Sequence, residues 1–303
     1  MKHHGETAWS PDGRSIVFTD DNMNGLDDFT YRYDIDDLRM LWQLDEGVTN
    51  FIFSPDGKII VSGRGRFLEF LDATTGKVVD TPYQDGASLT PIFLPDGSAL
   101  LVAQTGGLSI GESFTEIGIW DKDKKELNTT FQHNGLLSSL AVSPDGKFLA
   151  ASLGNILNSE GYKQNQTILW DWATKNKLCT FQGSDAAFDP TGDTVAVIGD
   201  NSNEKELFNL FDPSTCELIK TLYETENIGP FTYSPDGHML ALASGPEDKI
   251  QILDALTGEL LYEQDGQWET IWQLVFSPDG QYLMTRESYG AKEAIHLWKV
   301  VAP

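Results

Sequence analysis

Short apolar segments alternate with tight turns along the whole chain, and one turn sequence recurs. Ser-Pro-Asp-Gly occurs at residues 10–13, 54–57, 143–146, 234–237 and 277–280, with Leu-Pro-Asp-Gly at 94–97 and a degenerate Asp-Pro-Thr-Gly at 189–192. Proline presets the backbone at the first central position of a turn, and Asp-Gly supplies side-chain hydrogen bonding and a positive φ. Each copy is therefore predicted to form a tight turn.

The turns divide the chain into seven repeats, because their final glycines lie between 40 and 49 residues apart. Apolar residues precede and follow each turn, as at 51–53 and 59–61, which predicts a hairpin. A third segment follows and ends at Asp34, Asp72, Asp121, Asp171, Asp212, Asp254 and, in the last repeat, Lys299. A fourth amphipathic segment often comes after Thr-Gly, as at 74–79 and 256–261. Four strands in roughly 44 residues indicate a β-propeller.

We therefore expect an all-β fold, a seven-bladed β-propeller of four-stranded antiparallel blades forming a single domain over residues 1–303. The approximate blade limits are 5–44, 45–82, 83–131, 132–181, 182–222, 223–263 and 264–303. Only residues 301–303 follow the last third strand, too few for a fourth. We favour the interpretation that the natural protein is longer. The alternative is a three-stranded last blade whose open edge risks pairing with another chain.

Two Trp-Asp pairs, Trp120-Asp121 and Trp170-Asp171, close third strands, and with the recurring turn they resemble the WD40 family over essentially the whole chain. The family's Gly-His before the first strand is missing from every repeat, so the hydrogen-bonded tetrad through that histidine cannot be assumed. Residues 9–18 are also similar to the TolB propeller family. The resemblance implies a divergent, bacterial-style WD40 propeller, a noncatalytic scaffold that presents its faces to proteins or peptides.

Charge narrows the range of partners. The chain has 46 acidic and 21 basic residues and a net charge of −25, so it repels phosphate backbones and anionic lipids. We expect no nucleic-acid or membrane partner and a monomer with a well-solvated acidic exterior, which would attract cations or a basic protein surface. No secretion signal or long apolar span is evident, which slightly favours the cytoplasm over part of a larger or exported protein.

The two cysteines, Cys179 and Cys216, fall at different offsets in neighbouring repeats. A native disulfide between such positions would be fortuitous, because disulfide geometry is specific. Both thiols are therefore expected to be free.

A candidate calcium loop lies between the second and third strands of the first repeat. Its pattern places oxygen side chains at Asp20, Asn22, Asn24 and Asp28, a glycine at Gly25 and a backbone carbonyl at Leu26. Calcium takes six to eight hard oxygens from a tightly wound loop. The pattern resembles the loops of EF-hand-like and integrin-type propeller repeats, although Tyr31 stands where an EF-hand has glutamate. The alternative is a polar hairpin loop turning on Asn24-Gly25.

A partner-binding surface is predicted on the face that carries the loops between second and third strands. The loops at 104–116 and 153–167 are much longer than the turn at 64–66, and long loops on a rigid scaffold commonly bind. The candidate contact residues are Arg64, Arg66, Trp268, Trp272 and Arg286, because tryptophan and arginine dominate binding hot spots. The alternatives are that the long loops arose by neutral insertion, that the tryptophans pack locally and that the arginines form salt bridges.

The sequence contains few groups of residues typical of catalytic sites. The five histidines, His3, His4, His133, His238 and His296, occupy unlike repeat positions, and no nucleophile elbow or phosphate-binding glycine loop is present. We predict a noncatalytic protein- or peptide-binding scaffold with a structural calcium ion in the first blade. The alternatives are a propeller enzyme of the lactonase or phosphoesterase type with an axial metal, and an accessory or sensor domain of a larger enzyme.

Overall fold

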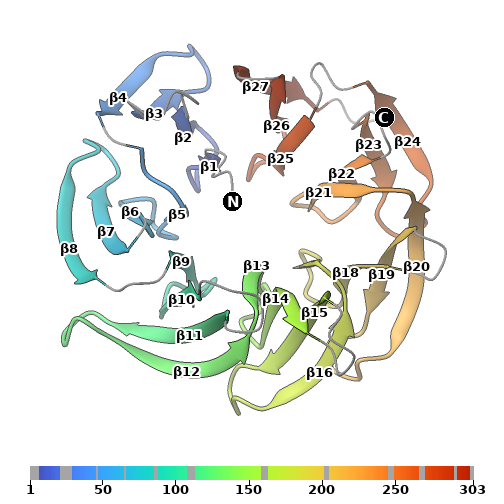
Figure 1. Cartoon of the computed structure of the whole chain (residues 1–303). Helices are drawn as coiled ribbons and strands as arrows, with labels where there is room; N and C mark the ends of the chain where they lie inside the picture. The colour runs from blue at the N-terminus through green and yellow to red at the C-terminus, as the bar shows by residue number, and fades with distance from the viewer. Residues whose placement is uncertain are drawn as a thin grey trace. The chain divides into compact units, whose positions relative to one another are not determined.

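A computed structural model describes residues 7–20, 29–45, 47–64, 66–84, 88–107, 113–157, 163–200, 205–244, 249–265, 270–289 and 292–300. The described residues form strands β1 to β27 and no helix, and therefore none that could cross a membrane. The strands make seven antiparallel sheets, six of four strands and one of three (Figure 1). This confirms the predicted seven-bladed β-propeller, with three strands in its last blade.

The chain forms two compact units. The first contains residues 1–104, 118–129 and 267–303, and the second contains residues 105–117 and 130–266. The first unit holds the first, second and last blades, the second unit holds the fourth, fifth and sixth, and the strands of the third blade contribute to both. Within each unit the first strands of successive blades lie side by side, because β1 contacts β5, β5 contacts β9, and β13 contacts β17.

The strand limits follow the repeat. The first three blades contain β1 (Thr7–Trp9), β2 (Ser15–Asp20), β3 (Phe29–Asp34), β4 (Met40–Leu44), β5 (Phe51–Phe53), β6 (Ile59–Ser62), β7 (Phe67–Asp72), β8 (Val78–Gln84), β9 (Ser88–Phe93), β10 (Leu100–Gly106), β11 (Phe114–Asp121) and β12 (Glu126–Asn134). The fourth and fifth contain β13 (Leu136–Val142), β14 (Phe148–Leu157), β15 (Lys163–Asp171), β16 (Lys177–Gln182), β17 (Asp185–Phe188), β18 (Val195–Asp200), β19 (Glu206–Phe211) and β20 (Leu218–Thr225). The last two contain β21 (Ile228–Tyr233), β22 (Met239–Ser244), β23 (Lys249–Asp254), β24 (Leu260–Gln264), β25 (Thr270–Phe276), β26 (Tyr282–Tyr289) and β27 (Lys292–Lys299).

The recurring turn is closed by its own side chains. In the first blade the Ser10 hydroxyl donates to Asp12 Oδ1 at 2.6 Å and accepts the Ser15 amide at 3.0 Å. The Gly13 amide donates to the Ser10 carbonyl, and Gly13 has a φ of 70°. The Ser10 side chain is buried, so these bonds satisfy a hydroxyl that water cannot reach. The same serine and aspartate contact recurs at Ser54, Ser143, Ser234 and Ser277.

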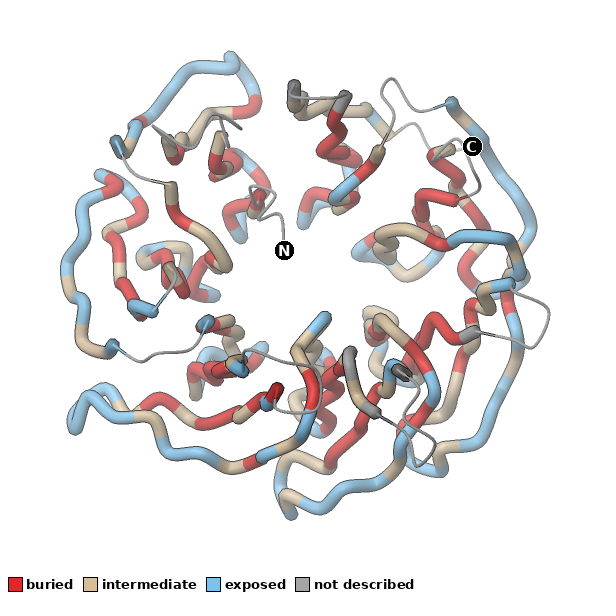
Figure 2. The backbone as a smooth tube through the Cα atoms, in the orientation of Figure 1, coloured by how far each residue is buried: buried red, intermediate tan, exposed pale blue. Residues whose placement is uncertain are grey.

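The core lies between neighbouring sheets. In β22 every residue from Leu240 to Ser244 is buried, whereas in β24 of the same sheet four of five residues are exposed. Figure 2 shows the same gradient in the other four-stranded sheets, with largely exposed fourth strands and buried middle strands. Apolar side chains of adjacent blades therefore form the packed layers that stabilise each unit.

In the first six blades an aspartate at or directly after the end of the third strand organises the turn into the fourth. Asp72 Oδ1 accepts both the amide and the hydroxyl of Thr75 at 2.8 Å. Four residues after each aspartate the backbone is left-handed, with φ from 53° to 79°, at Leu38, Gly76, Lys125, Lys175, Cys216 and Gly258. At Gly76, Lys125, Cys216 and Gly258 this position meets the fourth strand of the preceding blade. A Cβ on Gly76 would lie 2.7 Å from the Trp42 ring, and one on Gly258 would lie 3.2 Å from the Leu222 side chain.

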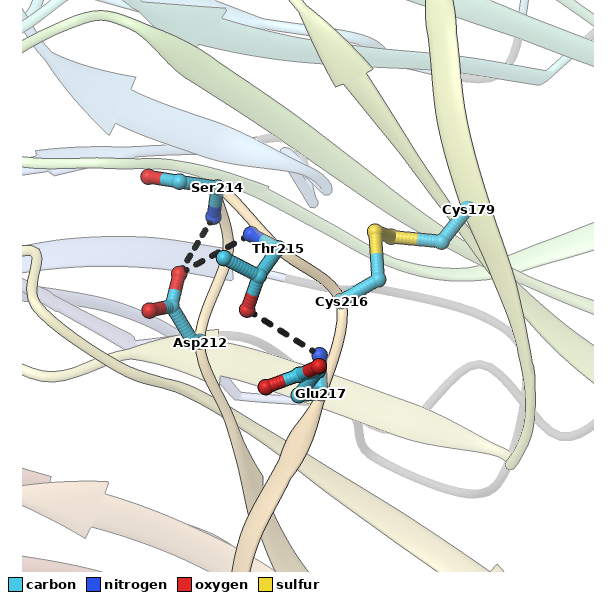
Figure 3. Close-up of a disulfide and its surroundings, with 6 residues drawn as sticks. All are labelled: Cys179, Asp212, Ser214, Thr215, Cys216 and Glu217. Carbon is cyan, nitrogen blue, oxygen red and sulfur yellow. Dashed lines mark hydrogen bonds between the residues drawn. A yellow bond between two sulfur atoms is a disulfide. The ribbon is translucent and has the colours of Figure 1, made fainter.

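The prediction of free thiols is wrong. Cys179 in β16 and Cys216 in the turn before β20 form a disulfide with Cα atoms 6.2 Å apart and a sequence separation of 37 residues. Figure 3 shows Cys216 leaving a turn in which Asp212 Oδ1 accepts the amides of Ser214 and Thr215 at 2.7 and 3.1 Å. The two cysteines can be bonded despite their different offsets within the repeat, because the fourth strand of one blade lies against the turn of the following blade.

The two long loops are shorter than predicted. Strand β10 continues to Gly106, and strand β11 begins at Phe114. Strands β14 and β15 stay paired as far as Leu157 and Lys163. Residues 108–112 and 158–162 lie outside the described residues. Much of each predicted loop is therefore an extended hairpin, because pairing continues through polar sequence.

Candidate binding surface

All predicted site residues belong to the first unit. The structure describes Asp20, Arg64, Arg66, Trp272 and Arg286, whereas Asn22, Asn24, Leu26, Asp28 and Trp268 lie outside the described residues. The described residues come from the first, second and last blades: Asp20 ends β2, Arg64 and Arg66 lie between β6 and β7, and Trp272 and Arg286 lie within β25 and β26.

The turn between β6 and β7 is held against the next blade by close backbone packing. Gly63 cannot carry a side chain, because a Cβ there would lie 1.7 Å from the Leu89 carbonyl oxygen. Its amide donates to the Asn50 carbonyl at 3.2 Å, and the Asn50 side-chain amide donates to the Leu89 carbonyl at 3.0 Å. The Phe67 amide donates a hydrogen bond to the Arg64 carbonyl at 2.9 Å. These bonds fix the chain immediately on either side of the two predicted arginines.

This turn forms one side of an open pocket. Arg64, Arg66, Phe67, Glu69 and Thr81 line it. The Phe67 ring is 38% exposed, Arg66 is exposed, and Glu69 is buried. Arg64 Nη1 lies 3.8 Å from Glu69 Oε1, which is long for an ion pair. The pocket therefore combines two guanidinium groups with an accessible aromatic ring.

Trp272 and Arg286 differ sharply in exposure. The Trp272 side chain in β25 is 40% exposed, and its indole donates to Ser288 Oγ at 2.6 Å. Arg286 in β26 is only 2% exposed, its Nε donates to Glu293 Oε2 at 3.0 Å, and its Nη2 donates to the Thr19 carbonyl. Trp272 thus offers a fixed aromatic surface. Arg286 ties the last blade to the first inside the protein and does not line the surface.

The bonds around Thr19 hold the base of the predicted calcium loop. Thr19 Oγ1 donates to the Val48 carbonyl at 2.5 Å, and the Val48 amide donates to Thr30 Oγ1 at 2.9 Å. Asp20 and Phe29 form the last pair of the β2–β3 ladder. Both ends of the loop at 21–28 are therefore fixed in position. In the part of the chain that the structure describes, no three His, Cys, Asp or Glu side chains are placed to hold a metal ion.

Comparisons with known proteins agree with this architecture. A family model described as "WD domain, G-beta repeat" matches residues 124–158, from the end of the third blade into the fourth. An "uncharacterized WD repeat-containing protein" of Synechocystis sp. is 28% identical over 156 residues. That match covers 50% of this chain and 41% of the relative, so this chain corresponds to less than half of the relative's length.

The chain is a WD40-like seven-bladed propeller. WD-repeat propellers are generally noncatalytic, and the fold is consistent with a role in protein interaction. The match to the family model includes the Ser-Pro-Asp-Gly turn at 143–146, one of the features on which the resemblance was based.

Three residues that line the pocket of this WD40-like propeller were not predicted from the sequence. Phe67, Glu69 and Thr81 complete the pocket beside the predicted arginines. The position of Phe67 directly after Arg66 was a usable signal, because the first residue of a third strand borders the preceding turn. Thr81 gave no signal, since it reaches the pocket only through the pairing of β8 with β7.

Proposed function

We propose that this WD40-like propeller is a noncatalytic scaffold that binds a protein or peptide segment at the pocket formed by Arg64, Arg66 and Phe67. The observation that carries the proposal is the pairing of two arginines with an exposed aromatic ring in a chain of net charge −25. Arginine and aromatic side chains supply most of the binding energy at interfaces, because they bury large areas and also form directional polar contacts.

The pocket chemistry selects the ligand class. Guanidinium groups bind carboxylates in a bidentate manner, and the Phe67 ring favours an adjacent apolar side chain. The ligand is therefore a peptide segment with an acidic residue beside an apolar one. Trp272, held by Ser288, supplies a second aromatic contact in the same unit.

A structural calcium ion is part of this proposal. Asp20, Asn22, Asn24 and Asp28 would contribute side-chain oxygens and Leu26 a backbone carbonyl. Support comes from the fixed loop ends, since the Arg286 contact to the Thr19 carbonyl and the Asp20–Phe29 pairing restrain them. A bound ion would hold these oxygens around one centre.

The test uses a displayed library of random peptides to select ligands for the immobilised protein, followed by fluorescence anisotropy with the selected peptides. Arg66→Ala should weaken binding about tenfold or more, as expected for a hot-spot residue. The matched control is Lys58→Ala, which removes another exposed cation from the other end of the same blade. Equal affinity of wild type and Arg66→Ala for every selected peptide would contradict the proposal. Metal-dependent hydrolysis of a lactone or phosphoester by the purified protein would favour the enzyme alternative.

A further inference from the structure

The start of β11 and the end of β12 form another open pocket. Phe114, Thr115, Glu116, Gln132, His133 and Asn134 line it, and its volume is about 390 Å³. All six residues belong to the second unit, whereas the Arg66 pocket belongs to the first. A pocket of this volume accommodates one long side chain or a small molecule.

The connection that follows β12 fixes the frame of this pocket. The Gly135 amide donates to the Ser113 carbonyl at 2.9 Å, and Thr115 Oγ1 donates to the Gly135 carbonyl at 2.9 Å. Gly135 has a φ of 109°, and a Cβ there would lie 2.9 Å from the Gly154 carbonyl oxygen in β14. Hydrogen bonds and close packing against β14 therefore hold the ends of both strands.

Four of the lining side chains form one accessible group. Successive residues of a strand point to opposite sides, so Phe114 and Glu116 share one side of β11, and Gln132 and Asn134 share one side of β12. Gln132 Nε2 donates to Glu116 Oε1 at 2.7 Å, which joins the two pairs. Phe114, Gln132 and Asn134 are exposed. An aromatic ring, a carboxylate and two carboxamides are therefore available to a ligand.

The polar members of this group supply hydrogen-bond acceptors. These are the Glu116 carboxylate, the Asn134 side-chain carbonyl and the Gln132 carbonyl, since the Gln132 nitrogen faces Glu116. The ion pairs of the third blade join Lys124 and Lys125 to other carboxylates, so among the described residues no lysine or arginine neutralises Glu116. Together with the net charge of −25, this favours a cationic ligand.

We propose that this pocket binds an arginine side chain of a partner protein. The planar guanidinium would stack on the Phe114 ring and donate to Glu116 and to the Gln132 carbonyl. Its five N–H donors suit several neighbouring acceptors, whereas a lysine ammonium is more strongly hydrated and cannot stack as a plane. The Arg66 pocket has the opposite charge, so this site takes a different segment and does not depend on the proposed function.

The probes are three blocked tripeptides, acetyl-Gly-Arg-Gly-amide and its versions with citrulline or lysine at the centre. Citrulline has nearly the shape of arginine but no charge. Ligand-observed NMR measures the Kd, and amide shift changes in the labelled protein locate the site.

Three variants of the full chain separate the contributions. Glu116→Gln removes the charge and keeps an acceptor for the Gln132 amide, and Phe114→Leu removes the ring and keeps an apolar side chain. Glu126→Gln is the matched control, because it changes the net charge equally at an exposed residue of the same strand, β12, outside the pocket.

We expect a Kd of about 1 mM for the arginine peptide, with shift changes in the six lining residues. Binding should be about tenfold weaker in Glu116→Gln, about threefold weaker in Phe114→Leu, and unchanged in Glu126→Gln and Arg66→Ala. Equal affinity for the citrulline or lysine peptide, equal affinity of Glu116→Gln and Glu126→Gln, or shift changes confined to other residues would each overturn the proposal. So would the absence of saturable binding up to about 10 mM arginine peptide.

Discussion

Removing the disulfide tests how strongly it stabilises the second unit. Cys179→Ala combined with Cys216→Gly breaks the covalent link between the fourth and fifth blades. Glycine suits position 216 because the backbone there is left-handed, with a φ of 63°, and glycine stands at the equivalent positions Gly76 and Gly258. The variant therefore removes the bond without adding backbone strain.

The magnitude follows from the length of chain that the bond closes. For a separation of 37 residues, loop-closure entropy gives about 4 kcal/mol of stabilisation at 25 °C. A chain of 303 residues that unfolds cooperatively loses about 1.6 °C of Tm per kcal/mol, so the expected decrease is about 6 °C.

Scanning calorimetry of the wild type and the variant, each with and without a phosphine reductant, measures this effect. The reductant should lower the Tm of the wild type to near that of the variant and leave the variant unchanged. A second variant with alanine at position 216 should melt lower still, because a Cβ is unfavourable in left-handed backbone by about 1 kcal/mol. A Tm difference of less than about 1 °C between the oxidised wild type and the glycine variant would refute the loop-entropy reasoning.

Three further predictions address the turns and the calcium loop. Gly76→Ala should cost about 3 kcal/mol, since its Cβ would lie 2.7 Å from the Trp42 ring, whereas Gly146→Ala, with the same φ of 71° and nothing within 4 Å, should cost about 1 kcal/mol. Equal urea midpoints for these two variants would contradict the packing argument. Asp20→Ala should lower the Tm in calcium but not in EDTA, and equal shifts in both buffers would remove the case for a bound ion. The Ser54 hydroxyl and the Lys58 amide lower the pKa of Asp56 from its usual 3.8 to about 2. The fold stabilises the ionised form of Asp56, so the stabilisation by this carboxylate is present above pH about 4 and is lost as the pH falls towards 2. Between pH 4 and 2 the urea midpoint should therefore fall less for Asp56→Asn than for the wild type.

The repeat could be predicted from the sequence because its signals act over a few residues. The bonds among Ser10, Asp12 and Ser15 span five residues, and the bonds that Asp72 accepts span three. Alternating apolar residues on either side of such turns define hairpins, and seven copies define seven blades. Third strands end at the predicted aspartates, apart from β19, which ends one residue before Asp212.

Tertiary structure alone decided which distant residues meet. Cys179 and Cys216 are joined because a fourth strand lies against the next blade's turn, a contact that no spacing within one repeat reveals. Arg286 appeared suited to a surface in an acidic chain, yet a carboxylate on β27 and a carbonyl on the first blade bind it inside the protein. Thr81 joined the candidate pocket only through the pairing of β8 with β7. Local hydrogen bonding specifies each blade, whereas side-chain burial and inter-blade bonds depend on packing between residues tens to hundreds of positions apart.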